Sequence, residues 1–199
     1  MDDLLEPFLM VVEDVFPRSQ GRAALVTGRI ERGRVLVGDE LQIVGGERTG
    51  TPVRVAGIEG PGRTPTRVGE AGGNVGLLLP HSVADAAVRG RVLAQPGTIG
   101  AHSSFAAALA LLPEEQGGAE VRTGDALVFH FGVDGVRGTV TLAPGTDVLH
   151  PLHTACVTVA LDGAVALESG WHFAFRFRGR AAGTGTVTRL IGAAPLTAP

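Results

Sequence analysis

The chain has 199 residues, which is enough for one or two domains with a core in each. Its hydrophobic content of 44% is that of a folded globular protein and excludes a disordered chain. The formal net charge of −3 argues against broad electrostatic binding of nucleic acid but leaves room for a local basic patch.

Residue usage excludes further classes. All 17 basic residues are arginines, so the chain lacks the lysine of a G-x-x-x-x-G-K-[ST] phosphate loop and any lysine that forms a Schiff base. No apolar run reaches the roughly 18 residues that span a bilayer, and the acidic start is unlike a signal peptide. A single cysteine, Cys156, permits no internal disulfide. We therefore expect a cytoplasmic protein that does not bind membranes.

The predicted elements, in chain order, are short strands bounded by Gly, Pro or Asp, which is typical of all-β proteins. The first half contains expected strands at 8–16, 23–30, 34–37, 40–44, 53–58 and 74–79. One helical turn is expected within HSVADAAVRG, residues 81–90. The second half contains expected strands at 103–111, 126–131, 136–142, 154–161, 171–178 and 184–191.

A Pro-Gly stretch at 94–104 lacks any periodicity and is interpreted as a linker. It divides the chain into an expected first domain at 7–97, a second at 98–192, and a tail at 193–199. Each half is long enough for a small closed barrel.

Several motifs occur in a known order. They are EDVF at 13–16, VTGRIERGRVLVGDELQIVG at 26–45, AGGNVGLLL at 71–79, RGRVLAQPGTIGAHSSF at 89–105, LLPEEQGG at 111–118, GTVTL at 138–142 and FAFRFRGRAAGTGTVTRLI at 173–191. In these segments the chain resembles translation elongation factor Tu over about 8–191. The resemblance implies two consecutive β-barrels, equivalent to the second and third domains of that factor.

The resemblance also implies what is missing. The GTPase domain of the family needs lysines in its phosphate loop and its guanine motif, and Met1 lies only seven residues before the first expected strand. We therefore expect a chain without a GTPase domain, without GTP and without enzyme activity.

By resemblance, one set of residues faces the acceptor end of aminoacyl-tRNA. Those expected near the aminoacyl group are Glu13, Asp14, Phe16 and Asn74, and those expected around the terminal adenosine are Ile30, Val35, Glu59 and Leu78. Carboxylate and amide oxygens suit an α-ammonium group, and an apolar slot with one polar group suits an adenine. The alternative is structural, with Asp14 and Asn74 satisfied by backbone amides and Phe16 in the core.

The chain departs from the family in three segments. The segment after Glu59 reads GPGRTPTRV, in which only Arg63 stands in for a basic run. The second half reads GGAEVRTG at 117–124, where the family has an Arg-His pair. Arg178 replaces a family glycine that lets the tRNA backbone approach. These changes disfavour full-strength delivery of aminoacyl-tRNA.

The stretch WHFAFRFRGR at 171–180 alternates aromatic residues with arginines. Strand alternation predicts one face made of Trp171, Phe173, Phe175 and Phe177 in the core, and the opposite face made of Arg176, Arg178 and Arg180. The arginine edge is a candidate for binding RNA phosphates, and an ordinary solvated face is the alternative.

No metal or cofactor is predicted. His150, His153 and Cys156 are spaced three apart, but an odd offset on a strand sends His153 and Cys156 to opposite faces. The remaining histidines stand near no plausible nucleophile.

Three hypotheses follow for the function. One is a translation-related module that binds the acceptor end of aminoacyl-tRNA. The second is a protein-interaction module or competitor that binds the ribosome or translation-factor proteins through the changed loops at 60–68 and 119–125. The third, a decoy for antibiotics that bind the family's second domain, is disfavoured by the altered loop after Glu59. No oligomeric state is predicted.

Overall fold

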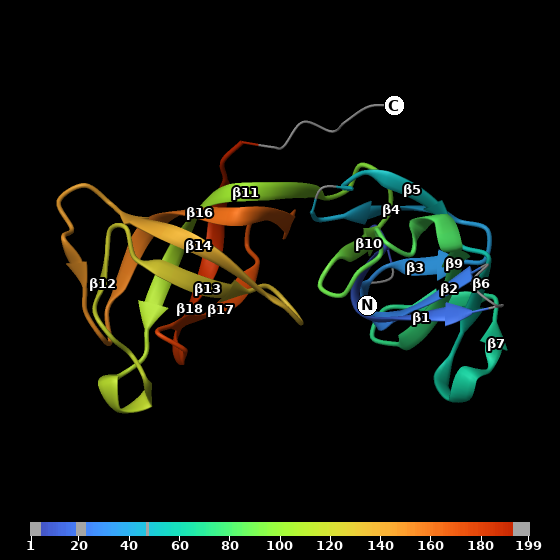
Figure 1. Ribbon diagram of the computed structural model, residues 1–199, viewed down its shortest axis with the longest axis horizontal. Coiled ribbons are helices and arrows are strands. Elements are labelled where there is room, and N and C mark those ends of the chain that lie inside the picture. Colours follow the sequence, from blue (N-terminus) through green and yellow to red (C-terminus); the bar gives the residue numbers. More distant parts are fainter. Residues whose placement is uncertain (1–4, 19–22, 47, 193–199) are drawn as a thin grey trace. The chain divides into compact units, whose positions relative to one another are not determined.

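A computed structural model describes residues 5–18, 23–46 and 48–192 and consists mainly of antiparallel strands (Figure 1). The expected all-β class is confirmed. The chain forms two compact units, of which the first ends at Gly100 and the second begins at Ala101. The expected tail at 193–199 lies outside the described residues. Within the described part of the chain, no helix is long and apolar enough to cross a membrane.

The first unit is built on one eight-stranded sheet in the order β5-β4-β10-β1-β2-β9-β6-β7. Its strands are β1 (Leu9–Arg18), β2 (Ala23–Arg32), β4 (Glu40–Val44), β5 (Thr51–Arg54), β6 (Gly57–Glu59), β7 (Pro65–Thr66), β9 (Asn74–Pro80) and β10 (Val92–Ala94). β5 pairs with β4 while β6, two residues further on, pairs with β9. The bent segment 51–59 therefore connects the two sides of the sheet, and the sheet curls into a barrel.

The sheet alternates as the sequence pattern predicts, with one face in the core. Buried side chains of β2 and β9 include Val26, Ile30, Leu77 and Leu79, each 0% exposed. A separate two-stranded ribbon joins β3 (Arg34–Leu36) to β8 (Val68–Glu70). The turn that follows β3 is stabilised by Asp39, whose Oδ2 accepts a hydrogen bond from the Leu36 amide at 2.8 Å.

The second unit is a closed barrel in the order β11-β16-β14-β13-β17-β18. Its strands are β11 (Gly100–Leu111), β13 (Ala126–His130), β14 (Gly135–Leu142), β16 (Thr154–Leu167), β17 (His172–Phe177) and β18 (Arg180–Leu190), and the ribbon β12 (Val121–Arg122) with β15 (Val148–Leu149) lies beside it. Closure removes the free sheet edges that would otherwise pair with other chains.

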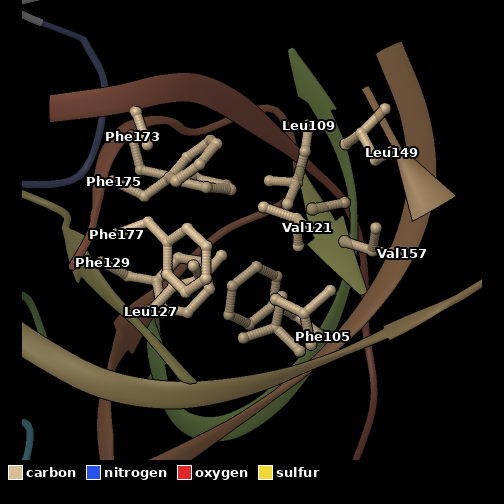
Figure 2. Close-up of a cluster of buried hydrophobic side chains, with 14 of the residues drawn as sticks. Phe105, Leu109, Val121, Leu127, Phe129, Leu149, Val157, Phe173, Phe175 and Phe177 are labelled. Carbon is tan, nitrogen blue, oxygen red and sulfur yellow. The ribbon is translucent and has the colours of Figure 1, made fainter. Parts of the chain in front are cut away.

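Phenylalanines fill the interior of this barrel (Figure 2). Phe105 meets Phe129, Phe131 and Phe173 edge to face, with ring centroids 6.2, 5.6 and 5.8 Å apart. Phe173, Phe175 and Phe177 are all buried, so the alternation predicted for this strand is confirmed on its aromatic side.

The structure differs from the expected elements in its shortest strands. β7, β8, β10, β12 and β15 were not predicted, because two or three residues are too few to show alternation. The expected linker at 94–104 narrows to 95–99, since β10 ends at Ala94 and β11 begins at Gly100. The expected helical turn is one 3₁₀ turn, η3 (His81–Val83).

Candidate ligand-binding site

A cavity of about 480 Å³ lies on the outer face of the first unit, over β1, β2, β9 and β6. Leu25, Thr27 and Gly76 form its floor, and any side chain at Gly76 would collide with Leu25. Its walls carry both charges and an aromatic ring. They comprise Glu13, Phe16 and Arg18 from β1, Glu59 from β6, Arg63 from the following loop, and Asn74 from β9.

A β-bulge in β1 positions the wall residues Glu13, Phe16 and Arg18. Val12 pairs with Gly28 but Asp14 pairs with Thr27, so Glu13 has no partner of its own. The extra residue shifts the alternation of the strand: Val12 points into the core, whereas Phe16 is 49% exposed and Arg18 lines the cavity. In a regular strand, residues two and four positions apart would share one face, so Phe16 would be buried.

The bulge requires a glycine opposite to it. A Cβ atom added at Gly28 would come closer than 3.0 Å to the carbonyl oxygen of Val11. On the β2 side, the Thr27 hydroxyl donates to the Asp14 carbonyl at 3.3 Å. Glycine at position 28 thus lets the two strands approach where the bulge forms.

Glu13 and Asn74 are exposed and supply oxygen acceptors at one end of the cavity. At the other end, Arg18 Nη2 lies 3.5 Å from Glu59 Oε2, and both side chains are partly buried. Arg18 Nε and Glu59 Oε2 are inaccessible to solvent and have no hydrogen-bond partner among the residues that the structure describes. Since an unsatisfied buried polar atom is costly, this end of the cavity favours rearrangement of the pair around a polar ligand.

The loop after β6 covers the cavity from the side. It contains one 3₁₀ turn, η2 (Pro61–Arg63), in which the Arg63 amide donates to the Gly60 carbonyl at 3.1 Å. The Gly60 amide in turn donates to the Thr64 carbonyl at 2.8 Å and joins the two ends of the loop. Arg63 has a φ of 61°, which is unusual for a residue with a side chain. Backbone strain of this kind is often found at ligand sites, and here it sets the direction of Arg63.

The cavity brings together Glu13, Phe16, Glu59 and Asn74 of the residues predicted to face an acceptor end. The others lie elsewhere. Ile30 and Val35 are 0% exposed in the core, Leu78 is half-buried beside Gly57, and Asp14 lies 3.6 Å from Arg89 outside the lining. Arg18 was not predicted, although its spacing of two from Phe16 would have placed it on the same face.

The sequence of the first unit matches the family model described as elongation factor Tu domain 2 over residues 23–94. Over these residues the first unit is similar to elongation factor Tu domain 2. It is therefore a translation-factor-like module. Glu59 and Asn74 fall within the matched residues, whereas Glu13, Phe16 and Arg18 precede them. The match ends at Ala94, so the likeness of the second unit to the family's third domain stays a prediction.

The predicted arginine edge of the second unit is divided between two strands. β17 ends at Phe177, and Arg178 with Gly179 forms a two-residue turn, with φ of 50° and 79°. The expectation of a strand through Arg178 is therefore wrong, because positive φ at both positions makes a type I′ hairpin turn. Arg178 lies over the Phe177 ring at 4.8 Å, while Arg176 and Arg180 are exposed on β17 and β18.

The histidines near Cys156 have other partners. His150 Nδ1 lies 3.1 Å from Glu120 Oε1, and His153 Nδ1 lies 2.9 Å from the Pro151 carbonyl. Among the described residues, no group of three or more His, Cys, Asp or Glu side chains is placed to hold a metal ion.

Proposed function

We propose that the first unit is a non-catalytic binding module for the aminoacylated 3′ end of tRNA. The observation that carries the proposal is the convergence of Glu13, Phe16, Glu59 and Asn74, which come from three strands, on one cavity. Its volume of about 480 Å³ is in the range of sites that enclose one small ligand group.

The two ends of the cavity suit the two parts of such a ligand. Glu13 and the Asn74 amide oxygen can accept hydrogen bonds from an α-ammonium group. Phe16 and Leu25 offer apolar surface to a base or a ribose, and Glu59 with Arg18 offers an acceptor and a donor to its polar edge. Arg63 at the rim is available for a phosphate, since it has no ion-pair partner among the described residues.

Arginines of the second unit add a weaker, salt-sensitive contribution in this proposal. Arg176 and Arg180 are exposed, and each phosphate they neutralise makes the affinity more dependent on salt. Their effect is independent of the aminoacyl group, so it is separable from that of the cavity.

The test is a titration of the protein with labelled aminoacyl-tRNA and with the deacylated form, at low and moderate salt. We expect tighter binding of the aminoacylated form, and a loss of that preference in Asn74→Ala and Glu13→Gln. Arg176→Ala is the control, because it should weaken both forms equally and lower the salt dependence. Equal affinity for both forms, or no binding, would contradict the proposal.

A second candidate is binding of a protein of the translation machinery through an exposed apolar patch. The patch consists of Leu36, Val37 and Val68 on the β3-β8 ribbon, which are 42%, 40% and 38% exposed. Leu36 lies directly opposite Val68, so the apolar surface is continuous. Leu36→Glu would abolish a ribosome or translation-factor interaction of this kind in a pull-down with purified components and leave tRNA binding unchanged.

A further inference from the structure

We infer that Arg89 is a positioning residue that holds the β1 bulge and thereby selects Glu13 as the carboxylate facing the ligand. The inference rests on the proposed function for its ligand, but the clamp itself can be tested without one. Arg89 does not line the cavity; it acts on the backbone behind it.

The contact of Arg89 with the bulge, here called the clamp, lies just beyond the point where β10 stops pairing with β1. Leu9, Met10 and Val11 pair with β10, and Val12 continues the ladder through its amide to the Arg91 carbonyl at 2.8 Å. The Val12 carbonyl accepts from the Gly90 amide at 2.9 Å. Beyond this point a side chain takes over, because Arg89 Nη1 donates to the Glu13 carbonyl at 3.1 Å.

The same guanidinium group engages the next residue. Arg89 Nη1 lies 3.6 Å from Asp14 Oδ1, whereas Glu13 has no ion-pair partner among the described residues. The Asp14 carboxylate is therefore paired with Arg89 outside the cavity, and the Glu13 carboxylate remains available inside it. An ammonium group in the cavity would meet Glu13.

Loss of the clamp would affect the whole wall. If the bulge were lost while Val12 stayed in the core, Asp14, Phe16 and Arg18 would turn towards the core and the cavity would lose Phe16 and Arg18, because residues two positions apart in a regular strand face the same side. From the β2 side, the Thr27 hydroxyl donates to the Asp14 carbonyl at 3.3 Å beside the backbone pairing of the two strands.

The ion pair of Arg89 with Asp14 contributes little to global stability. The Arg89 side chain is 50% exposed and that of Asp14 is 58% exposed, and exposed ion pairs are weak in water. Replacing Arg89 should therefore change the site without unfolding the unit. If Arg89 had a purely structural role, its replacement would instead lower the stability of the unit and leave the amide signals of the bulge and the ligand preference unchanged in the folded protein.

The experiment compares Arg89→Leu and Arg89→Lys with Arg54→Leu. Arg54 is a matched control, since its Nε donates to the Gly38 carbonyl at 3.1 Å in the same unit but away from the cavity. Amide spectra by NMR report the bulge without ligand. Titrations with aminoacyl-tRNA and deacylated tRNA then report the preference for the aminoacylated form.

We expect Arg89→Leu to shift the amide signals of residues 13–16 and 27, with the urea midpoint nearly unchanged. The preference for aminoacyl-tRNA should fall by about tenfold, as expected for loss of a charge-assisted contact. Arg89→Lys should keep the amide signals of these residues and the preference for aminoacyl-tRNA close to those of the unmodified protein, because an ammonium group can still donate to the Glu13 carbonyl. Arg54→Leu should change neither.

The outcomes separate the two proposals. If the unmodified protein prefers aminoacyl-tRNA and Arg89→Leu keeps that preference, the role of Arg89 is wrong and the proposed function stands. If the unmodified protein shows no preference, the proposed function and the ligand part of the inference both fail. In that case, unchanged signals at residues 13–16 in Arg89→Leu would also overturn the clamp, and shifted signals restored by lysine would support it.

Discussion

Replacement of Gly28 by alanine tests the link between the bulge, the barrel and the cavity. The added Cβ atom would come closer than 3.0 Å to the carbonyl oxygen of Val11 and to 3.2 Å of Met10 Cγ. Because the near neighbour is backbone, β1 has to move away from β2 by about 1 Å, at an overpacking cost of about 1–3 kcal/mol. Weakened ladder hydrogen bonds beside it contribute about 1 kcal/mol more.

We therefore expect Gly28→Ala to lower the free energy of unfolding of the first unit by about 3 kcal/mol, from a total of about 5–10 kcal/mol for a domain of this size. The melting temperature of the unit should fall by about 15 °C. Aminoacyl-tRNA preference should fall as well, because Glu13 and Phe16 are carried by the displaced strand.

The assay uses urea unfolding with two probes. Trp171 is the only tryptophan of the chain and lies in the second unit, so its fluorescence reports that unit alone. Far-ultraviolet circular dichroism reports both units, and only its first-unit component should shift. Gly57→Ala is the control, since a Cβ there meets Leu78 at an ordinary 3.6 Å. A change below about 0.5 kcal/mol for Gly28→Ala would refute the reasoning.

Two further predictions concern the second barrel and the turns. Phe105→Ala should lower the stability of the second unit by about 4 kcal/mol, because it empties a fully buried position and removes three edge-to-face ring contacts. Trp171 fluorescence in urea measures it, and a loss below about 1 kcal/mol would be inconsistent with a close-packed core. Asp39→Ala and Asp125→Ala should each cost about 1 kcal/mol, since each carboxylate accepts a backbone amide hydrogen, at 2.8 and 2.7 Å. The first should move the dichroism component of the first unit and leave Trp171 fluorescence unchanged, whereas the second should move Trp171 fluorescence together with the dichroism component of the second unit.

Much of the fold could be predicted because its longer strands alternate in the sequence. The buried faces of β2, β14 and β17 follow from apolar residues or glycine at every second position. The short strands could not be predicted. β12 and β15, for instance, exist because residues 121–122 pair with 148–149, and no local pattern encodes a partner so distant in the chain.

The candidate site was predicted in residue type but only partly in geometry. Glu13, Phe16, Glu59 and Asn74 were expected together, and one cavity contains them. Ile30 and Val35 were expected with them but lie in the core, because their strand positions face inward. No sequence signal pointed to Arg89, whose role depends on a contact between residues 76 positions apart.

By itself the sequence determined the class of the protein. Alternating apolar residues between glycine-rich turns specify strands, and a chain without lysine cannot form the phosphate loop of a GTPase. The tertiary structure decided which side chains of β1 face the cavity. That choice depends on where the strand gains one unpaired residue against its neighbours, and such a register is set by contacts with β2 and with the loop of Arg89, which lie outside the strand itself.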